Sequence, residues 1–395
     1  MRILTINCGS STLKFELFEA EDGERSLARG VVDRIGGRAS AELAGRSGER
    51  TVRSIGAADH GEATHQAIRL LSSSGLLGGL DAVGHRVVHG GARFSGPALL
   101  DAGVEETIEE LAQLAPLHNE PSLVAIRAVR EALGPGVSQV AAFDTAFHSR
   151  MPRVARLFAL PRKLAEEGVL RYGFHGLSYE YIMGELRALD PEGAAGCVLI
   201  AHLGNGASMI AVRGGVGVET TMGLTPTGGL VMGTRSGDLD PSVLLYLQEK
   251  KELSPPEVGA LINRRAGLLG VSGTTADMRD LLNREATDPR AAEAVALFCY
   301  QAKKFLGALA AALGGLDTLV FTGGIGERAA PVRWRICEGL EFLGLKLDRS
   351  RNAEHAPIVS SADTPATVRV IPTDENLMVA RHTRELVGPT TKEGA

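Results

Sequence analysis

Two segments of the chain, one at its beginning and one near its middle, share a pattern of an apolar run, a polar glycine-rich turn and a second apolar run. The first is Ile3–Phe18, whose turn reads Asn-Cys-Gly-Ser-Ser-Thr, and the second is Cys197–Gly215, whose turn includes Asn205-Gly206. Alternating β-prone residues on both sides of such a turn predict a β-hairpin. A repeated opening hairpin favours two halves with one architecture, although the two segments have little sequence identity.

Strand-like and helix-like patterns alternate along the rest of the chain. Strand-like runs are Asp81–Gly91, Ser138–His148 and Leu316–Phe321. Helix-like runs are Val104–Leu114, Ser122–Leu133 and a long segment that opens at Asp288-Pro289 and closes near Gly314-Gly315. Strands that alternate with helices predict mixed sheets covered by helices, the α/β class. With 395 residues, the chain is long enough for two domains.

Charge and cysteine content narrow the class of protein. The formal net charge of −5 and the isoelectric point near 6.1 argue against a protein that binds nucleic acid or anionic membranes. The four cysteines lie far apart without a CxxC pair, which fits reduced thiols better than a disulfide framework or a zinc site. The sequence has no basic-then-apolar leader and no apolar run long enough to span a membrane, so we expect a cytoplasmic protein.

Three polar turns rich in glycine indicate a phosphate-binding protein. Two are the hairpin turns described above, and the third, Thr322–Gly326, lies between a buried-looking strand and a helix. Consecutive small residues expose backbone N–H groups, and a following helix adds partial positive charge. One such turn is weak evidence, because most glycine turns only reverse the chain, but three favour nucleotide binding. The sequence has neither GxxxxGK(S/T) nor GxGxxG after a strand, which argues against a P-loop protein and a Rossmann dehydrogenase.

Two arginines stand in segments with few other charges. Arg86 follows His85 in an otherwise apolar run, and Arg235 lies in the glycine- and threonine-rich loop Thr221–Pro241. An arginine on a strand most often forms a surface ion pair, but the valines and glycines around Arg86 imply burial. Buried arginines pair with carboxylates or phosphates, and phosphoryl transfer needs cations near the equatorial oxygens. Lys14, in the second strand of the first hairpin, is either a further cation at the site or a solvent-facing residue.

Three histidines and two carboxylates complete the candidate site. His118, His175 and His202 each lie beside an apolar run or a glycine turn, and each alone is more often structural than catalytic. His175 is the strongest candidate, because it lies in a loop without periodicity. Asp144 and Glu375 follow strand-like runs, where ligands of open α/β sheets bind, and Mg²⁺ prefers oxygen ligands. The alternative is that both carboxylates cap the segments that follow them.

These segments occur in a recognisable order along nearly the whole chain. They read NCGSSTLK, GHRVVHGG, APLHN, FDTAFH, YGFHG, HLGNGAS, MGTRSGDLDP, GVSG, FTGGIGE and IPTDEN. The sequence therefore resembles the acetate/propionate/butyrate kinase family of the actin/hexokinase/Hsp70 superfamily. The resemblance implies an α/β fold of duplicated actin-like (ribonuclease H-like) βββαβαβα domains with a nucleotide cleft between them. It assigns residues 1–147 and 377–395 to the N-terminal domain and residues 148–376 to the C-terminal, nucleotide-binding domain.

The resemblance also assigns roles to individual residues. The catalytic residues would be Asp144, Arg86, His175 and Arg235. The acyl substrate would contact Arg86, Val88, Leu117, His118, Phe174 and Pro226. The metal would lie near Asn7 and Glu375. The nucleotide would contact Lys14, Ser10, Ser11, Thr12, His202, Leu203, Gly204, Asn205, Gly206, Asp277, Met278, Arg279, Gly323, Gly324, Ile325 and Gly326.

The activity that the resemblance implies is reversible transfer of the ATP γ-phosphoryl group to acetate by a cytoplasmic homodimer. Mg²⁺ would be the metal, with Mn²⁺ as an alternative, and the products would be acetyl phosphate and ADP. Two other functions stay open: a propionate or butyrate kinase of the same fold, and a non-catalytic, ATP-driven actin/Hsp70-like module. The module would need neither the two arginines nor an acyl pocket. Arg328 replaces the asparagine of the family motif GIGEN, which leaves the choice of phosphoryl donor open.

Overall fold

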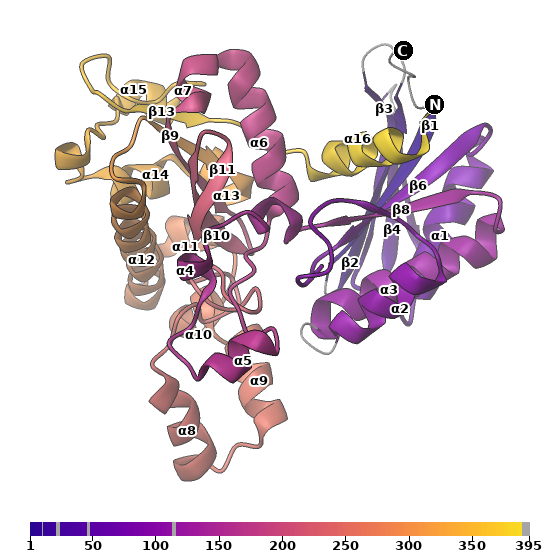
Figure 1. The fold of residues 1–395 in the computed structure, drawn as a ribbon, viewed down its shortest axis with the longest axis horizontal. Helices are drawn as coiled ribbons and strands as arrows, with labels where there is room; N and C mark the ends of the chain where they lie inside the picture. Colours follow the sequence, from indigo (N-terminus) through magenta and orange to yellow (C-terminus); the bar gives the residue numbers. More distant parts are fainter. Residues whose placement is uncertain (10, 21–23, 46–47, 113–115, 389–395) are drawn as a thin grey trace. The chain divides into compact units, whose positions relative to one another are not determined.

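The chain forms two compact units. A computed structural model describes all residues except 10, 21–23, 46–47, 113–115 and 389–395, and it leaves the side chains of residues 116–118 undescribed. The first unit contains Met1–Ser149 and the C-terminal segment that begins at Asp374, and the second contains Arg150–Thr373 (Figure 1). The chain passes from one unit to the other after Ser149 and again after Thr373, where the family resemblance predicts boundaries at 147/148 and 376/377.

The first unit is built on one mixed sheet with the strand order β5-β4-β3-β2-β1-β6-β8-β7. Its strands are β1 (Arg2–Cys8), β2 (Thr12–Glu19), β3 (Arg25–Asp33), β4 (Ser40–Gly45), β5 (Arg50–Ser54), β6 (Leu80–Val87), β7 (Ala98–Leu99) and β8 (Ser138–Phe143). Its helices are α1 (His60–Ser73), α2 (Ala102–Ala112), α3 (Pro116–Leu133), the short 3₁₀ helix η1 (Ala146–His148) and α16 (Glu375–Val387). The predicted opening hairpin is present as the antiparallel pair β1–β2, and β6 and β8 run parallel to β1.

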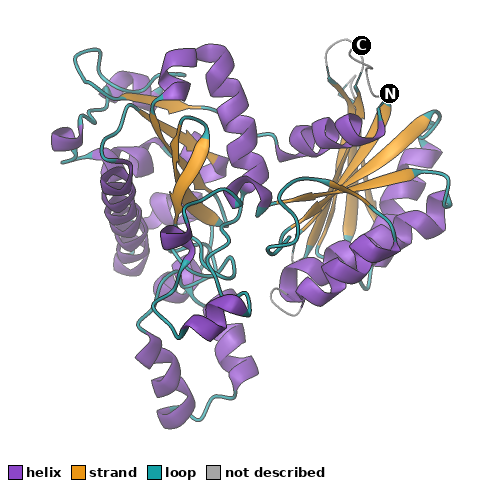
Figure 2. Cartoon of the chain, viewed as in Figure 1, coloured by secondary structure: helices purple, strands orange, loops and turns teal. Residues whose placement is uncertain are grey.

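Helices cover both faces of this sheet (Figure 2). Leu4 and Ile6 of β1 belong to the core that includes α1 and α3, whereas Ile3, on the other face, packs with Ala380 of α16. Because both faces are covered, β1 is almost continuously buried. Gly84 on β6 permits the close approach of α16, because a Cβ at Gly84 would lie 2.3 Å from Thr383 Oγ1.

The second unit repeats the central topology of the first. Its strands are β9 (Cys197–Leu203), β10 (Ala207–Arg213), β11 (Val216–Thr220), β12 (Thr318–Thr322) and β13 (Thr367–Val370). Their order, β11-β10-β9-β12-β13, matches β3-β2-β1-β6-β8, with antiparallel hairpins on one side and parallel strands on the other. This shared order, together with the structural relatives reported below, confirms the predicted class of duplicated α/β domains.

The helices of the second unit surround this sheet and form an arm beyond it (Figure 1). They are α4 (Arg153–Arg156), α5 (Arg162–Glu166), α6 (Gly176–Leu189), α7 (Pro191–Ala195), α8 (Pro241–Lys250), α9 (Pro255–Arg264), α10 (Gly267–Ser272), α11 (Met278–Arg284), α12 (Pro289–Leu313), α13 (Gly323–Arg328), α14 (Ala330–Cys337), η2 (Glu341–Leu343) and α15 (Arg349–Ala353). None of the helices in the described part of the chain has the length and apolar character that crossing a bilayer requires.

Local signals account for both ends of α12 but not for the start of α3. Asp288 caps the N-terminus of α12 and Gly314, in a left-handed conformation, ends it, as predicted. The helix-like run Ser122–Leu133 is part of α3, which begins earlier, at Pro116, and contains Pro121. A proline near the start of a helix removes one backbone hydrogen bond, and the rest of α3 tolerates this loss. All four cysteines are free thiols, as expected.

Candidate active site

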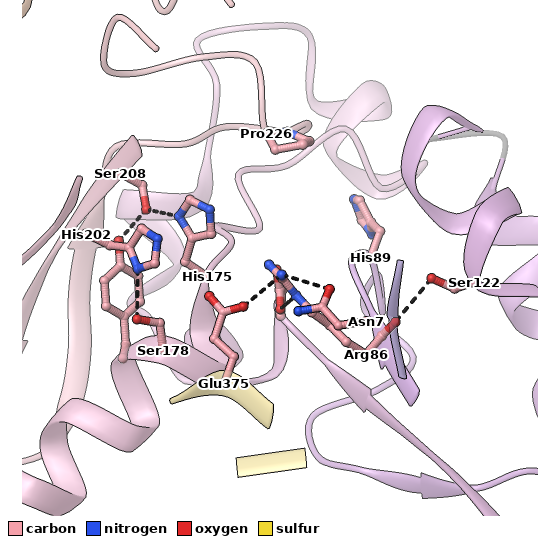
Figure 3. Close-up of polar contacts among 12 residues, drawn as sticks. Asn7, Arg86, His89, Ser122, His175, Ser178, His202, Ser208, Pro226 and Glu375 are labelled. Carbon is pink, nitrogen blue, oxygen red and sulfur yellow. Dashed lines mark hydrogen bonds and ion pairs between the residues drawn. The ribbon is translucent and has the colours of Figure 1, made fainter. Parts of the chain in front are cut away.

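Arg86 is the centre of a buried cluster in the first unit (Figure 3). It lies on β6, between β1 and β8, so the surface ion pair considered above does not apply. Its Nε and Nη2 atoms donate hydrogen bonds to Asp144 Oδ1 at 2.9 Å and Oδ2 at 2.6 Å, a bidentate pair. The side chain of Asp144, which directly follows β8, is only 1% exposed. This geometry fixes the plane of the guanidinium group.

Glu375 and Asn7 complete the cluster from α16 and β1. Arg86 Nη1 lies 2.8 Å from Glu375 Oε2 and donates to Asn7 Oδ1 at 3.2 Å. The N-terminus of α16 is capped by Asp374, whose Oδ1 accepts the N–H of Leu377. Asp374, and not Glu375, is therefore the N-cap residue of α16, and both Glu375 and Asp144 pair with Arg86.

The cluster has more negative than positive charge. Two carboxylates, Asp144 and Glu375, surround one guanidinium, so their formal charges sum to −1. Burial alone would lower the pKa of Arg86, but the two carboxylates outweigh it and hold that pKa above its usual range. Oxygen donors with a residual negative charge fit a divalent cation such as Mg²⁺. Among the described residues no three acidic, histidine or cysteine side chains form a metal site by themselves, so further ligands would come from water or phosphate.

The first glycine turn lies next to this cluster in the sheet. Lys14 is exposed on β2 and is paired directly opposite Asn7, so the two side chains share one face of the sheet. The turn is closed by the N–H of Gly9, which donates to Thr12 O at 2.8 Å. Ser11 is exposed and Thr12 is half-buried, whereas Ser10 lies outside the described residues. Val88, the predicted acyl contact, is buried just beyond β6.

Two stacked histidines mark the candidate site of the second unit. The rings of His175 and His202 are 4.2 Å apart between centroids and inclined by 22° (Figure 3). His175 precedes α6 in a left-handed conformation with φ of 59°, which is uncommon for a residue with a side chain. His202 is the penultimate residue of β9.

The second glycine turn lies against both histidines. A Cβ at Gly206 would lie 3.3 Å from His175 Nε2 and 3.7 Å from Arg235 Nη2. A Cβ at Gly204 would lie 3.8 Å from His202 Nε2 and 4.0 Å from the backbone nitrogen of Gly324. A side chain at Gly204 or Gly206 would project into the space beside these groups. The structure therefore brings the second and third glycine turns, both histidines and Arg235 together in one unit.

Arg235 is held by its own loop. Its Nη1 atom donates to Pro226 O at 2.7 Å, and Pro226 is buried, as is Phe174. These are two of the predicted acyl contacts. The side chains of two further predicted acyl contacts, Leu117 and His118 in the first turn of α3, lie outside the described part of the chain.

The third glycine turn is the first turn of α13 and is fixed at both ends. Glu327 Oε1 accepts the N–H groups of Gly323 at 3.0 Å and Thr373 at 3.3 Å. At the other end, the buried Arg333 donates to the carbonyl oxygens of Gly326 and Glu327 at 2.8 and 2.9 Å. Burial lowers the pKa of Arg333 to about 10. This cation satisfies the last carbonyls of α13 and so holds the turn in place.

Three predicted nucleotide contacts have local roles in the structure. Asp277 caps α11 and accepts the N–H of Arg279 at 2.8 Å. The side chain of Arg279 is 83% exposed, and Met278 is buried. Their described contacts do not include the glycine turns, so their nucleotide role stays a prediction.

Sequence reasoning missed the hydroxyl groups behind the histidines. His175 Nδ1 is hydrogen-bonded to Ser208 Oγ at 2.9 Å, and Ser208 also contacts the hydroxyl of Tyr179. His202 Nδ1 is hydrogen-bonded to Ser178 Oγ at 2.8 Å. The register of the β9–β10 hairpin places Ser208 opposite His202, so hairpin pairing is the one signal that could have pointed to Ser208.

Comparison with known proteins decides the family. The model of the Acetokinase family matches residues 2–381. The chain belongs to this family. It is 46% identical over 388 residues to "Acetate kinase" of Rhodopseudomonas palustris strain TIE-1, and the match covers 96% of this chain and 97% of the relative. It is 44% identical to "Acetate kinase" of Solibacter usitatus, covering 97% of each chain.

Solved structures of the acetokinase family share the fold. The acetate kinase of Porphyromonas gingivalis matches with a TM-score of 0.89 at 37% identity and covers 98% of this chain and 99% of its own. A propionate kinase from Francisella tularensis matches with a TM-score of 0.92 at 36% identity, covering 97% and 99%. The chain is therefore a transferase, a kinase of carboxylates with ATP as co-substrate.

Proposed function

We propose that this kinase transfers the γ-phosphoryl group of ATP to acetate, reversibly, giving acetyl phosphate and ADP. The observation that carries the proposal is the buried Arg86 with its carboxylate partners in a chain whose curated relatives are named acetate kinases. A largely buried guanidinium attracts the charge of a small carboxylate, and we assign the buried, apolar Val88, two residues further along the chain, to pack against the methyl group.

The transfer is direct. The acetate carboxylate is already ionised at pH 7, so no general base is needed. One carboxylate oxygen attacks the γ-phosphorus, a new O–P bond forms, and the bond to the bridging oxygen breaks in line, with its electron pair leaving on ADP. Catalysis then depends on positioning and on stabilising charge, and we assign this work to Arg86, Asp144, His175 and Arg235.

Each of these residues has a distinct task. Arg86 and Arg235 bind the carboxylate and the equatorial phosphoryl oxygens, and Asp144 holds the plane of Arg86. His175 donates a hydrogen bond to an equatorial oxygen in the transition state. The nucleotide phosphates bind to two glycine turns, Gly204–Gly206 and Gly323–Gly326, and to His202. The short distance between Gly204 and the backbone nitrogen of Gly324 supports a phosphate site that both turns share.

We propose Mg²⁺ as the metal, with Mn²⁺ as an alternative. Asn7 and Glu375 would hold it, and Asp144 would lie nearby, because this oxygen-rich set has a residual negative charge. When bound, the ion neutralises charge on the nucleotide phosphates.

Propionate is the second candidate substrate, because one of the structural relatives is a propionate kinase from Francisella tularensis. One methylene group is worth only about 1–3 kcal/mol of discrimination, so we expect overlap between acetate and propionate. A comparison of kcat/KM for acetate, propionate and butyrate decides between them.

We also propose a cytoplasmic homodimer that binds neither nucleic acid nor membranes. Support for self-association comes from α8, whose side chains include the exposed Val243, Leu245 and Tyr246 and none that is buried. Sedimentation analysis of the full chain, compared with Leu245→Glu, tests this state. A monomer at micromolar concentration would contradict it.

The assay for the main proposal is trapping of acetyl phosphate as a hydroxamate. We expect product that requires acetate, a divalent metal and ATP, with GTP and pyrophosphate tested as other donors. ATP hydrolysis without acetate-dependent hydroxamate would instead favour the non-catalytic module.

A further inference from the structure

The Nδ1 atom of each stacked histidine is hydrogen-bonded to a serine hydroxyl that contacts a second hydroxyl, and we call each such pair of hydroxyl groups a relay: Ser208 with Tyr179 for His175, and Ser178 with Thr373 for His202. Ser208 Oγ lies 2.9 Å from His175 Nδ1 and also contacts the Tyr179 hydroxyl, while both serine and tyrosine are buried (Figure 3). Behind the other ring, Thr373 Oγ1 donates to Ser178 Oγ at 2.8 Å, and Ser178 Oγ lies 2.8 Å from His202 Nδ1. The two relays are built alike, yet they share no residue.

Proton counting gives each relay a direction. A serine hydroxyl has one proton to donate, and it can accept others through its lone pairs. A phenol is more acidic than an alkyl hydroxyl and is the better donor, so Tyr179 donates to Ser208. Ser208 then donates its own proton to His175 Nδ1. With Thr373 as the donor to Ser178, the proton of Ser178 is left for a hydrogen bond to His202 Nδ1.

The charge state of the rings follows from their stacking and from their serine partners. Two imidazolium rings with centroids 4.2 Å apart would repel each other, so the doubly charged pair is disfavoured, and a ring whose Nδ1 accepts a hydrogen bond from a serine hydroxyl is neutral. A neutral imidazole that accepts at Nδ1 has its proton on Nε2. Both Nε2 atoms lie at the second glycine turn, His175 beside Gly206 and His202 beside Gly204.

We propose that Ser208 with Tyr179, and Ser178 with Thr373, are positioning residues that fix both histidines as neutral Nε2–H tautomers. Each ring thereby presents an N–H donor to the anionic phosphate chain at the Gly204–Gly206 turn. This inference rests on the proposed role of the turn and of His175 in phosphoryl transfer. Thr373 is also the last residue of the second unit, so the His202 relay ends where the chain leaves that unit.

The direct test is nuclear magnetic resonance of the full-length protein with ¹⁵N-labelled histidine, with and without ADP. Signals are assigned with His175→Gln and His202→Gln. We expect Nδ1 of both rings to give the far-downfield signal of an unprotonated nitrogen and Nε2 that of a protonated one. Ser208→Ala should change the tautomer signals of His175 alone, and Ser178→Ala those of His202 alone.

Ser360→Ala is the matched control. Ser360 is a buried serine of the same unit whose hydroxyl accepts the N–H of Val368. We expect it to leave both histidine spectra and kcat unchanged. A wild-type ring with its proton on Nδ1, or a His175 spectrum that Ser208→Ala leaves unchanged, would overturn the proposal.

Kinetic measurements distinguish the proposed role of the relay from the proposed role of His175 in phosphoryl transfer. We expect Ser208→Ala to lower kcat by about 10- to 100-fold, with KM for ATP and acetate changed less than about threefold, because the donor acts in the transition state. Ser208→Thr keeps the hydroxyl and should restore both kcat and the spectrum. If Ser208→Ala changes the His175 spectrum but not kcat, the relay stands and the assignment of His175 to the transition state fails.

Discussion

Removal of the Arg86 side chain tests both the chemistry and the electrostatics of the central cluster. In Arg86→Ala, Asp144 and Glu375 lose their cation while their side chains stay 1% and 16% exposed. Loss of one partner of a buried ion pair costs about 3–5 kcal/mol, because it leaves an uncompensated buried charge. The loss of a guanidinium that stabilises the transferring phosphoryl group should also lower kcat by about 10³-fold or more.

A double variant separates the two effects. In Arg86→Ala/Asp144→Asn the buried carboxylate is replaced by a neutral amide of similar shape, so one of the two stranded charges disappears. We expect the double variant to recover about 1–3 kcal/mol of the lost free energy of unfolding, the cost of one unpaired buried charge, while activity stays absent. An Arg86→Ala protein that is merely misfolded would show no such recovery.

The pH dependence provides a second check. Without Arg86, burial disfavours the charged form of the Asp144 carboxylate, and a lower pH that favours its protonated form reduces this cost. The loss in free energy of unfolding from wild type to Arg86→Ala should therefore be smaller at pH 5 than at pH 8. In the double variant, this loss should depend less on pH.

Arg335→Ala is the matched control. Arg335 makes a bidentate pair with Glu285 at 2.8 and 2.8 Å, but the arginine side chain is 36% exposed. Such an exposed pair contributes about 0–1 kcal/mol, so we expect little loss of stability and wild-type kcat. The measurements are urea unfolding followed by circular dichroism and the hydroxamate assay. An Arg86→Ala enzyme with kcat within tenfold of wild type, or a double variant no more stable than the single one, would refute the reasoning.

Three further outcomes are expected. Arg235→Ala should lower kcat by orders of magnitude, because the cation assigned to the phosphoryl group is lost, while circular dichroism shows a folded protein. Hydroxamate formation near the wild-type rate would contradict its assignment. Burial lowers the pKa of His85 to about 4, so the contribution of neutral His85 to the free energy of unfolding is complete above the ordinary pKa of 6.5 and should fall by about 3 kcal/mol as pH decreases to about 4. Urea unfolding of His85→Gln should show a flatter dependence of this free energy on pH over that range. A pH dependence as steep as that of the wild type would exclude this role. Gly84→Ala should destabilise the protein by about 1–3 kcal/mol, because its Cβ would lie 2.3 Å from Thr383 Oγ1, and an unchanged unfolding midpoint would show that α16 can move away.

Much of the site could be predicted because its signals are local. The hairpin turns, the helix caps of α12 and the burial of Arg86 all follow from neighbouring residues, through turn chemistry and apolar flanks. Local sequence could not distinguish the adjacent Asp374 and Glu375, one of which caps α16 while the other reaches Arg86. That distinction depends on where β6 lies, which is a matter of tertiary structure.

The hydroxyl relays were unpredictable for a similar reason. Ser178 and Thr373 are far apart in sequence, and neither stands out from other polar residues near a helix start or a strand end. Arg333 likewise resembles a surface arginine in sequence, yet it is fully buried against carbonyl oxygens of α13. Such contacts arise only when distant elements pack, so periodicity and turn signals do not reveal them.

The discontinuous first unit has a consequence for how the protein is made. During translation the segment Arg150–Thr373 emerges as one continuous stretch and can fold before synthesis ends, whereas the first unit must wait for its last helix. Until α16 leaves the ribosome, one face of β1, β6 and β8 has no helical cover, and Arg86 has no Glu375. The packing of α16 therefore covers that apolar face and places the Glu375 carboxylate beside Arg86 in the same step. A nascent chain that stops short of α16 lacks both the helical cover of this face and the Glu375 carboxylate.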